Sequence, residues 1–323
     1  MGNGEWPIGS KIPSQRTLAK HFEVNRSTVI TALEELMADG SYSLMIGLWA
    51  SAFPGIRAGL ESYTPEHLAL FRLLIGSMAL VVFAVLTHMR LPDMKDIPAI
   101  LSLGFLGFAL YHILLNIGEK TVSAGVASLL VTMTPIFSAM LSRLFFGEHF
   151  GLYKWIGSII SLLGVSIITF GAGNYTHSVN GILLILLAAF SESIYFVFQA
   201  RYIKKYGFIP FVTFTIWGGT IPMLVFLPGL GEEFLNASMN STLSIVYLGL
   251  LPTVVPYFAL AYVTSLVGTS EATISLYLTP AVALAISWVW LGEVPAFIAL
   301  TGGMVTVAGV CFTYLKANKI RLK

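Results

Sequence analysis

Charged side chains are scarce in this 323-residue chain: they make up 11% of it, whereas hydrophobic residues make up 56%. A soluble globular domain carries about 25% charged residues, so a water-solvated fold is excluded for most of the chain. The mean hydropathy of +0.82 supports the same conclusion. We therefore predict an integral membrane protein that is surrounded mainly by membrane lipid.

Cysteine and nucleotide-binding motifs are also nearly absent. Cys311 is the single cysteine, so an internal disulfide and a thiolate metal cluster are both excluded. The chain has no G-x-x-x-x-G-K-[ST] sequence, which excludes ATP hydrolysis at a P-loop. The sequence also shows no carboxylate pair, nucleophile triad or metal-ligand cluster. We therefore predict that the protein is not an enzyme and needs no cofactor and no metal.

Apolar sequence, by contrast, is abundant: beyond residue 40, long hydrophobic stretches follow one another almost without pause. Each is about 20 residues long or more, enough for a helix to cross the roughly 30 Å hydrocarbon core of a bilayer. We predict an all-α membrane protein with ten transmembrane helices, near residues 41–60, 65–89, 97–118, 121–146, 150–171, 179–203, 208–228, 241–266, 268–291 and 295–316.

The sequence repeats itself at an offset of 145 residues. When residues 97–170 are set beside residues 242–315 without a gap, 15 of 74 positions are identical. Roughly five or six identities would be expected from so biased a composition. The identical pairs include Leu103/Leu248, Gly104/Gly249, Thr134/Thr279, Pro135/Pro280 and Gly147/Gly292. The chain is therefore interpreted as two copies of one five-helix unit, at 41–172 and 178–317.

Five helices per copy is an odd number, so the second copy starts from the opposite side of the membrane and the two repeats are inverted. Lys and Arg set the orientation, because they are enriched in cytoplasmic loops. If the chain enters from the cytoplasm, eleven of them face inward, including those of the basic tail at 318–323, and three face outward. We predict a multi-pass protein of the cell membrane with both termini in the cytoplasm.

Glycines on two predicted helices recur with the same spacing. Gly157 and Gly164 lie seven residues apart on one helix, and Gly302 and Gly309 repeat this arrangement on another. Small residues let the backbones of membrane helices approach closely, which is how such helices associate in lipid. These four glycines are interpreted as sites of helix packing.

Pro135 and Pro280 sit inside two predicted helices at equivalent positions. Each proline frees a backbone carbonyl and kinks its helix. The kinks are interpreted either as gating joints or as fixed bends that shape the bundle. The two Gly-Glu pairs that follow, at 147–148 and 292–293, are interpreted as turns at the membrane surface.

An ionisable group in the middle of a membrane helix costs about 2.5–3.5 kcal/mol or more and usually faces the bundle interior. Glu192 is such a group, near the middle of the predicted helix 179–203, with Tyr195 and Gln199 following it. It is our first candidate for the transport site, as a proton acceptor or as the partner of a substrate amine. The alternative is a neutral carboxyl that is hydrogen-bonded for packing alone.

Other polar groups at membrane depth extend the set of candidates. Arg72 lies one to two turns inside the second predicted helix, and Arg57 lies near the outer end of the first. Either arginine pairs with Glu192, meets a substrate carboxylate or extends to the interface. His112 and Asn116 are four residues apart and share one helix face. The aromatic residues that either line a cavity or pack against lipid are Trp49, Trp217, Tyr257 and Tyr262.

Several of these motifs together carry a family resemblance. The first copy contains LWASAF at 48–53 and SAGVASLL at 123–130, and the second contains YLTP at 277–280 and LGE at 291–293. Over residues 43–315 the chain resembles two EamA domains of the drug/metabolite transporter superfamily. The resemblance implies a ten-helix carrier, often an exporter of amino acids or related metabolites, with a small-molecule substrate. A proton or another ion gradient is the candidate driving force.

The first 40 residues (1–40) differ, because they hold nine of the chain's 34 charged residues. Residues 9–19 read GSKIPSQRTLA and residues 24–36 read VNRSTVITALEEL, which resembles the helix-turn-helix core of a GntR-type winged-helix regulator. The residues that the resemblance places against DNA are Arg16, Arg26 and Thr28. The helix that normally precedes this core and the wing that follows it are missing, and four Lys/Arg against five Asp/Glu leave a net charge of −1. We expect no specific DNA binding from this truncated segment.

Three functions remain open from the sequence. The first, which we favour, is secondary export of a small polar or amphipathic metabolite. The second is a membrane-tethered transcription regulator whose transmembrane helices sense a ligand. The third, a membrane enzyme or a structural scaffold, has little support because no catalytic groups are evident.

The predicted orientation is testable by cysteine labelling with a membrane-impermeant reagent. Cysteines introduced near Gly173 and Asn240 are expected to react from outside the cell, because the inverted repeat places both positions at the outer surface. Cysteines introduced at Lys204 and Lys319 are expected to stay protected. Labelling of the carboxyl terminus from outside would contradict the inverted repeat.

Overall fold

The computed structural model describes residues 26–147, 152–171, 175–267, 269–272, 276, 279–294 and 296–314. Every regular element within these residues is helical, as the sequence predicts. The described segments that are long and apolar enough to cross a membrane are Pro65–Leu86, Ile97–Glu119, Ala124–Phe146, Val179–Tyr206, Phe208–Phe226 and Met239–Leu266. Shorter apolar helices occur at 282–291 and 300–309.

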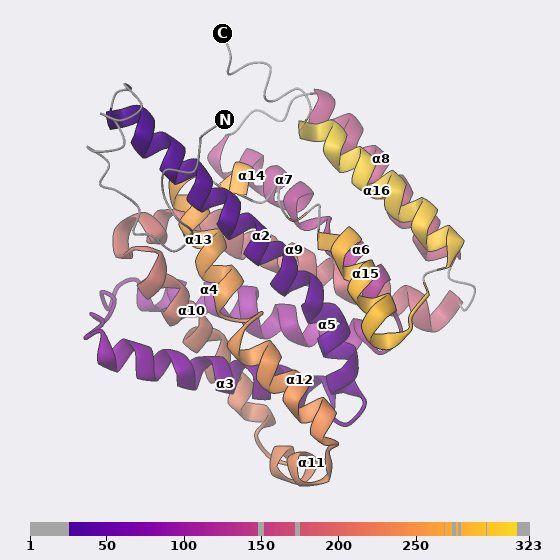
Figure 1. The fold of residues 1–323 in the computed structure, drawn as a ribbon, viewed down its shortest axis with the longest axis horizontal. Coiled ribbons are helices and arrows are strands. Elements are labelled where there is room, and N and C mark those ends of the chain that lie inside the picture. The colour runs from indigo at the N-terminus through magenta and orange to yellow at the C-terminus, as the bar shows by residue number, and fades with distance from the viewer. Residues whose placement is uncertain are drawn as a thin grey trace, which may run out of the picture.

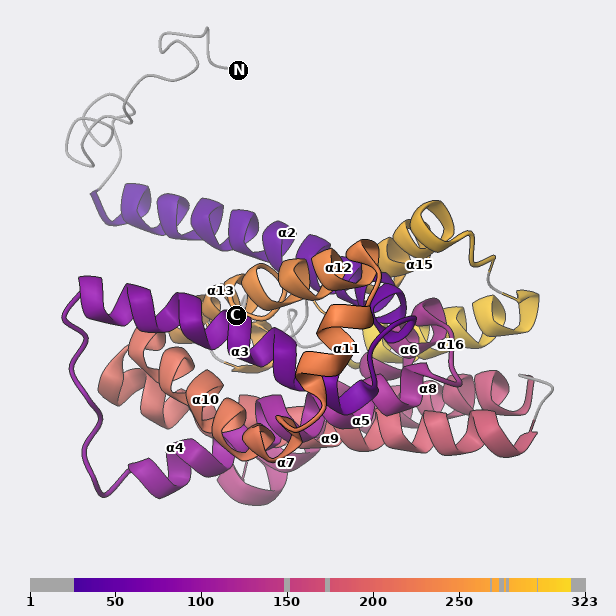
Figure 2. The ribbon, with the colours of Figure 1, turned by 90° about the horizontal axis from the view of Figure 1, so that it is seen from below.

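The helices form a bundle, in which the long helix α2 lies beside α12 and α13 (Figure 1, Figure 2). Helix α2 (Arg26–Leu60) packs against α12 (Met239–Leu250), α13 (Val255–Val267) and α15 (Thr279–Leu291) of the second sequence copy. Helix α9 (Tyr175–Tyr206), which follows α2 at an offset of about 145 residues, packs against α5 (Tyr111–Glu119), α6 (Ala124–Val131) and α7 (Thr134–Phe146) of the first copy. The leading helix of each copy is thus buried against the other copy.

Helix α2 is continuous over 35 residues, so the helix that contains the predicted membrane segment 41–60 already begins at Arg26. The sequence from 26 to 40 contains no proline, and the glycine at its end costs a helix only about 1 kcal/mol relative to alanine. Nothing local therefore ends the helix at the junction. Arg26 and Thr28 belong to its first turns, but their side chains, like all of Arg16, lie outside the described residues.

The predicted helix 121–146 is divided in the structure. Helix α6 ends at Val131, a turn follows at Thr132 and Met133, and α7 begins at Thr134. Pro135 therefore lies in the first turn of α7 and does not kink a continuous helix, since its missing N–H and its ring disrupt the turn before it. Pro280 likewise lies in the first turn of α15, which begins at Thr279.

The predicted helix 241–266 is also divided, into α12 and α13. The turn at 251–254 contains Pro252, and Pro256 follows in the first turn of α13. Neither proline can donate a backbone hydrogen bond, so the helical ladder is interrupted here. This break matters for the interior of the bundle because it carries the buried Thr253, whose Oγ1 accepts a hydrogen bond from Arg72 Nε.

The third predicted membrane helix is continuous but distorted. Helix α4 (Ile97–Gly104) passes through a π-helical segment, η1 (Phe105–Leu110), into α5. Such segments occur often at functional sites. Gly107 allows this one to lie against α9, since a Cβ there would come within 2.5 Å of the Tyr195 ring.

The remaining described helices are α3 (Pro65–Leu86), α8 (Leu152–Gly171), α10 (Phe208–Met223) with η2 (Leu224–Phe226), α11 (Leu230–Asn236), α14 (Thr269–Ala272) and α16 (Phe297–Tyr314). No helix is predicted from the sequence where α11 lies. This short helix covers the start of α3: Glu233 Oε2 lies 2.9 Å from His67 Nδ1 and accepts a 3.0 Å hydrogen bond from the backbone N–H of Thr64.

The loop between α3 and α4 is tied to the end of α9 by polar contacts. Lys205 Nζ donates to Asp93 Oδ2 at 2.6 Å and also to Asp96 Oδ2. Tyr206 donates its hydroxyl to the same Asp96 oxygen. Hydrogen bonds from Lys205 and then from Tyr206 hold the pKa of Asp96 below its ordinary value.

Helices α8 and α16 lie side by side at one edge of the bundle and are in backbone contact (Figure 1). A Cβ added at Gly164 would come within 2.6 Å of the Gly302 carbonyl oxygen. A Cβ added at Gly309 would come within 2.7 Å of the Gly157 carbonyl oxygen. Gly309 is the equivalent of Gly164 in the second copy, and Gly302 is the equivalent of Gly157. The two contacts are therefore equivalent to each other, with the roles of the two copies reversed.

Reciprocal contacts occur elsewhere at the same offset. Ser161 Oγ donates to the carbonyl oxygen of Thr306, 145 residues later, at 3.0 Å. Gly104 lies against the backbone of α10, and Gly249, its partner in the second copy, lies against the backbone of α3. A reciprocal contact set is the pattern that a two-fold axis produces.

The glycine contacts predict a stability effect. Gly164→Ala and Gly309→Ala are each expected to lower the free energy of unfolding by about 1–3 kcal/mol, because backbone atoms that cannot move aside occupy the space. Gly47→Ala is the matched control, since nothing lies within 4 Å of a Cβ at that helical position. Thermal denaturation of detergent-purified protein measures all three. Equal melting temperatures for Gly164→Ala and Gly47→Ala would contradict the backbone contact.

Candidate functional site

A small cavity lies where the two sequence copies meet. It measures about 30 Å³, and its lining residues are Trp49, Ala52, Phe53, Ile56, Arg72, Tyr111, His112, Leu115, Ser128, Val131, Thr132, Glu192, Tyr257, Leu276 and Thr279. A water molecule requires at least about 10–15 Å³ by this measure, so the cavity has room for a few waters and not for a metabolite. Any solute that passes through this site requires the helices to move apart.

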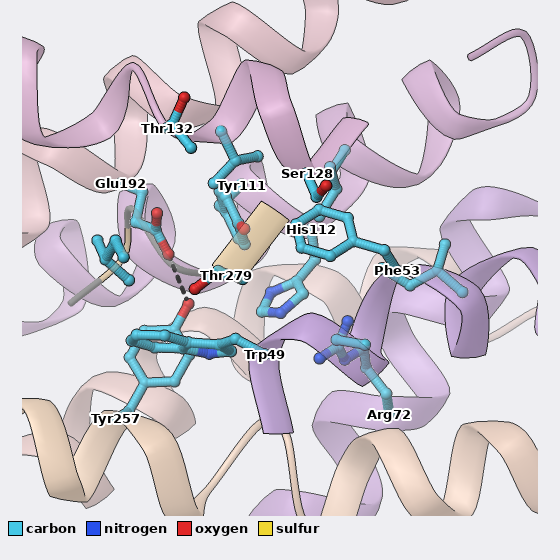
Figure 3. Close-up of a pocket in the computed structure, with 15 residues that line it drawn as sticks. Trp49, Phe53, Arg72, Tyr111, His112, Ser128, Thr132, Glu192, Tyr257 and Thr279 are labelled. Carbon is cyan, nitrogen blue, oxygen red and sulfur yellow. Dashed lines mark hydrogen bonds between the residues drawn. The ribbon is translucent and has the colours of Figure 1, made fainter. Parts of the chain in front are cut away.

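Glu192 occupies one side of the cavity. It lies on α9 and is 4% exposed. Its Oε1 accepts a 3.0 Å hydrogen bond from the Tyr257 hydroxyl (Figure 3). Its Oε2 accepts a 3.4 Å hydrogen bond from Thr134 Oγ1 at the start of α7. A carboxylate has about four acceptor sites, so two remain for a further donor.

Arg72 occupies the opposite side of the cavity from Glu192 (Figure 3). The residue is 2% exposed, and its Nε donates a 2.9 Å hydrogen bond to Thr253 Oγ1. Thr253 in turn donates to the carbonyl oxygen of Leu248 at 2.8 Å, which is available because the helix is interrupted at 251–254. The break between α12 and α13 thus supplies the acceptor that a buried guanidinium needs.

Neither arginine that the sequence offers as a partner of Glu192 fills that role. Within the described residues no ion pair joins Glu192 to Arg72, which is hydrogen-bonded to Thr253. Arg57 lies in the last turn of α2, where its Nε is 3.3 Å from Glu293 Oε1. The cavity therefore carries one acidic and one basic side chain that are held apart, each by neutral hydroxyl groups.

His112 lies between these two charged groups in the view of Figure 3. Its Nδ1 is 2.7 Å from the carbonyl oxygen of Phe108, in the π-helical segment. A carbonyl oxygen only accepts, so Nδ1 carries a hydrogen and Nε2 of the neutral ring is an acceptor. His112 also meets the Tyr111 ring edge to face, with centroids 5.1 Å apart.

Aromatic rings close the remaining wall. Trp49 of α2 meets Tyr257 of α13 edge to face, with ring centroids 5.3 Å apart. Phe108 packs on the same tyrosine with centroids 4.5 Å apart. The wall combines apolar surface with the hydroxyl that holds Glu192, which suits an organic solute with both charged and apolar parts.

Other predicted site residues lie outside the cavity. Asn116 Nδ2 donates to the carbonyl oxygen of Pro65 at 3.0 Å, at the start of α3. The Tyr195 hydroxyl is 3.4 Å from Thr215 Oγ1. Trp217 Nε1 donates to the carbonyl oxygen of Ser77 at 3.3 Å. The predicted residues that do not line the cavity are Asn116, Tyr195, Gln199, Trp217 and Tyr262.

Several lining residues are not predicted from the sequence: Phe53, Tyr111, Ser128, Thr132 and Thr279. The internal repeat carries a signal for one of them. His112 and Tyr257 are 145 residues apart and both line the cavity, and Thr134, which binds Glu192, is the partner of Thr279. A residue that faces a pseudo-symmetry axis in one copy is expected to have an equivalent that faces it in the other copy. Because Thr134 binds Glu192, this rule predicts that its equivalent, Thr279, also lies at the site.

Comparison with known proteins identifies the family. The EamA-like transporter family matches this chain twice, over residues 42–170 and 179–315. The chain belongs to the EamA-like transporter family. This membership and the described apolar helices make it a multi-pass membrane protein, and they point to a transporter of small molecules that is not an enzyme.

Two relatives of this EamA-like chain span most of its length. A Bacillus subtilis protein named as the transporter YdfC is 82% identical over 280 residues, which cover 87% of this chain and 92% of that protein. A Streptantibioticus cattleyicolor protein named as a probable terminal-alkyne amino-acid exporter is 37% identical over 267 residues, which cover 83% of this chain and 90% of that protein.

The amino-terminal segment matches a different family, the bacterial regulatory proteins of the gntR family, over residues 2–41. A Bacillus subtilis HTH-type transcriptional regulator, YdfD, is 92% identical over 40 residues. These cover 12% of this chain and 8% of that regulator. The predicted resemblance of this segment to a GntR-type helix-turn-helix is confirmed, as a fragment of a much longer protein.

A protein of known crystal structure shares the fold of the EamA-like chain. It superposes with a TM-score of 0.60 at 17% sequence identity, over 88% of this chain and 98% of that one. At this identity the match speaks for the fold alone.

Proposed function

We propose that this EamA-like protein is a secondary transporter that exports small zwitterionic metabolites, such as amino acids or related compounds, by alternating access. The observation that carries the proposal is the pair of buried charges, Glu192 and Arg72, on opposite sides of one cavity. A carboxylate and a guanidinium held apart match the ammonium and carboxylate groups of an amino acid. The Streptantibioticus cattleyicolor relative, named as a probable amino-acid exporter, supports the same substrate class.

The cavity geometry supports an occluded stage of such a cycle. Its volume of about 30 Å³ admits no amino acid, so binding requires separation of the helices that line it. Half-helix boundaries lie at or near the cavity: Thr132 lines it, and Thr253 of the break at 251–254 binds Arg72, which lines it. The substrate sites of secondary transporters are typically formed by discontinuous helices at the interface between two repeats.

We further infer ten transmembrane helices in two inverted repeats, 41–172 and 178–317, with both termini in the cytoplasm and the protein in the plasma membrane. The reciprocal contacts of α8 with α16 support a two-fold relation between the copies. The antiparallel register of these contacts supports inversion, since Gly164 meets Gly302 while Gly157 meets Gly309. Pro135 and Pro280 are equivalent hinge candidates in this arrangement, because each starts a half-helix beside the cavity.

The role of Glu192 is testable by substitution. Glu192→Gln is expected to lower transport of neutral amino acids about 10- to 100-fold, because a charge-assisted hydrogen bond worth about 1.5–3 kcal/mol is lost. It is also expected to flatten the pH dependence of transport. Counterflow of a panel of radiolabelled neutral amino acids in proteoliposomes measures both effects. Glu232→Gln, at an exposed position on α11, is the matched control.

An unchanged rate and pH profile in the Glu192→Gln protein would assign this carboxyl to packing alone. Absence of counterflow by the parent protein with every neutral amino acid would count against the substrate class. Expression and the elution volume in size-exclusion chromatography distinguish loss of transport from loss of folding.

The resemblance of the amino-terminal segment to a regulator suggests a second candidate function, a membrane-tethered transcription regulator that binds DNA. We do not expect this function, for two reasons. The segment's net charge of −1 removes the counterion-release contribution that drives even non-specific binding. The helix that would read DNA continues without interruption into the first membrane helix. A mobility-shift assay of the intact purified protein is expected to show no sequence-selective complex. Nanomolar, sequence-selective binding would revive the sensor hypothesis.

A further inference from the structure

Glu119, the last residue of α5, is completely buried, and neither of its carboxyl oxygens has a hydrogen-bond partner in the structure. The next residue, Lys120, is exposed. A buried carboxylate without a partner costs several kcal/mol, so such a group is stable when it binds a proton or when a cation reaches it. No role in the cavity accounts for Glu119, which does not line it.

Arg57 lies directly beside this group and is held by other partners. Its Nη1 donates to the main-chain carbonyl oxygen of Glu119, and its Nε lies 3.3 Å from Glu293 Oε1. Glu293 Oε2 accepts a 3.2 Å hydrogen bond from the backbone N–H of Ala124 at the start of α6. This contact set, here called the Arg57 clamp, joins α2, α5, α6 and the end of α15.

The Arg57 clamp separates the central cavity from the outer surface. On its inner side, Ile56 precedes Arg57 and Leu115 lies one turn before Glu119, and both line the cavity. On its outer side lies a polar hollow of about 450 Å³ that is lined by Arg57, Leu60, Glu61, Lys120, Leu291 and Glu293. A solute that moves from the cavity into this hollow must therefore pass the clamp.

Few charges face Glu119. The groups close enough to interact with it electrostatically are Arg57 from α2, Glu293 from the end of α15 and Arg72 from α3. Helix α6 carries no charged residue, and neither does the stretch 179–190 of α9, which packs against the end of α5. Arg72 is engaged by Thr253, so Arg57 is the cation positioned to reach the Glu119 carboxyl.

We propose that Glu119 is a proton-binding site that controls the outer gate of the transport path. With the gate closed, Arg57 pairs with Glu293 and Glu119 holds a proton. When the gate opens, the Glu119 proton passes to water in the outer hollow, Arg57 leaves Glu293, and its guanidinium pairs with the Glu119 carboxylate. Glu293 is then solvated in the hollow. The inference rests on the proposed transport function, because it assigns the gate of that same path.

The experiment measures gate opening without any substrate. Ser128→Cys, in a background with Cys311→Ser, places one thiol in the cavity wall. Right-side-out membrane vesicles are treated with a membrane-impermeant, cationic methanethiosulfonate between pH 5.5 and 8.5. Thiol ionisation itself speeds labelling as the pH rises, so rates are compared between variants at each pH. Glu119→Gln mimics the protonated form and keeps the gate closed.

The ratio of the parent labelling rate to the Glu119→Gln rate is expected to rise with pH, by up to about tenfold per unit for one proton. Glu61→Gln, whose exposed carboxyl lines the same hollow, is expected to follow the parent. Glu293→Gln removes the closed-state partner of Arg57 and is expected to speed labelling most at acid pH. This variant keeps the proposal testable if Glu119→Gln does not fold.

The proposal would be overturned if the ratio of the parent labelling rate to the Glu119→Gln labelling rate were constant with pH. It would also be overturned if Glu293→Gln were labelled no faster than the parent at acid pH. These outcomes are independent of the transport site. Labelling requires no substrate, so a pH-dependent gate with unaffected transport in Glu192→Gln would refute the central site and retain the gate. Loss of transport in Glu192→Gln together with a labelling ratio that is constant with pH would support the central site and refute the gate.

Discussion

Placing a charge at membrane depth costs at least about 2.5–3.5 kcal/mol, and the fold around Glu192 and Arg72 is arranged to offset that cost. Arg72 receives its acceptor from Thr253, which is available because two prolines interrupt the helix around it. Glu192 receives a donor from Thr134, the first residue of a half-helix. Irregular backbone at membrane depth is tolerated where it lines a cavity, and here it also supplies the partners of the charges.

The same constraint explains why the bundle packs so closely at its edge. Lipid offers no hydrophobic drive for two apolar helices to associate, so α8 and α16 depend on van der Waals contact and on hydrogen bonds between them. Glycine at 157, 164, 302 and 309 brings the backbones together, and the Ser161 hydroxyl then reaches the Thr306 carbonyl oxygen. This contact holds α8 and α16 together at the edge of the bundle.

Much of this architecture follows from the sequence alone, since hydropathy locates apolar helices and the 145-residue offset pairs them. The interruptions are harder to predict, because proline in a membrane helix either kinks it or ends it, and neighbouring groups decide which. Helical spacing places Asn116 on the same helix face as His112, but it does not show that Asn116 lies one turn nearer the start of α3, where it donates to the Pro65 carbonyl oxygen. Glu119 was missed for a related reason, since a Glu-Lys pair at a helix end suggests a solvated turn.

In the amino-terminal segment, the helix that forms is determined by the local sequence and not by the fold of the regulator family that the segment matches. Residues 2–41 match a regulator family, yet the part from Arg26 onward continues as one helix into the membrane bundle. A recognition helix and a membrane helix have the same backbone requirement, and no proline stands at the junction to separate them. The segment therefore extends α2, whose far end carries Arg57 and whose middle carries Trp49. A helix that contributes to both the cavity wall and the Arg57 clamp connects these two sites.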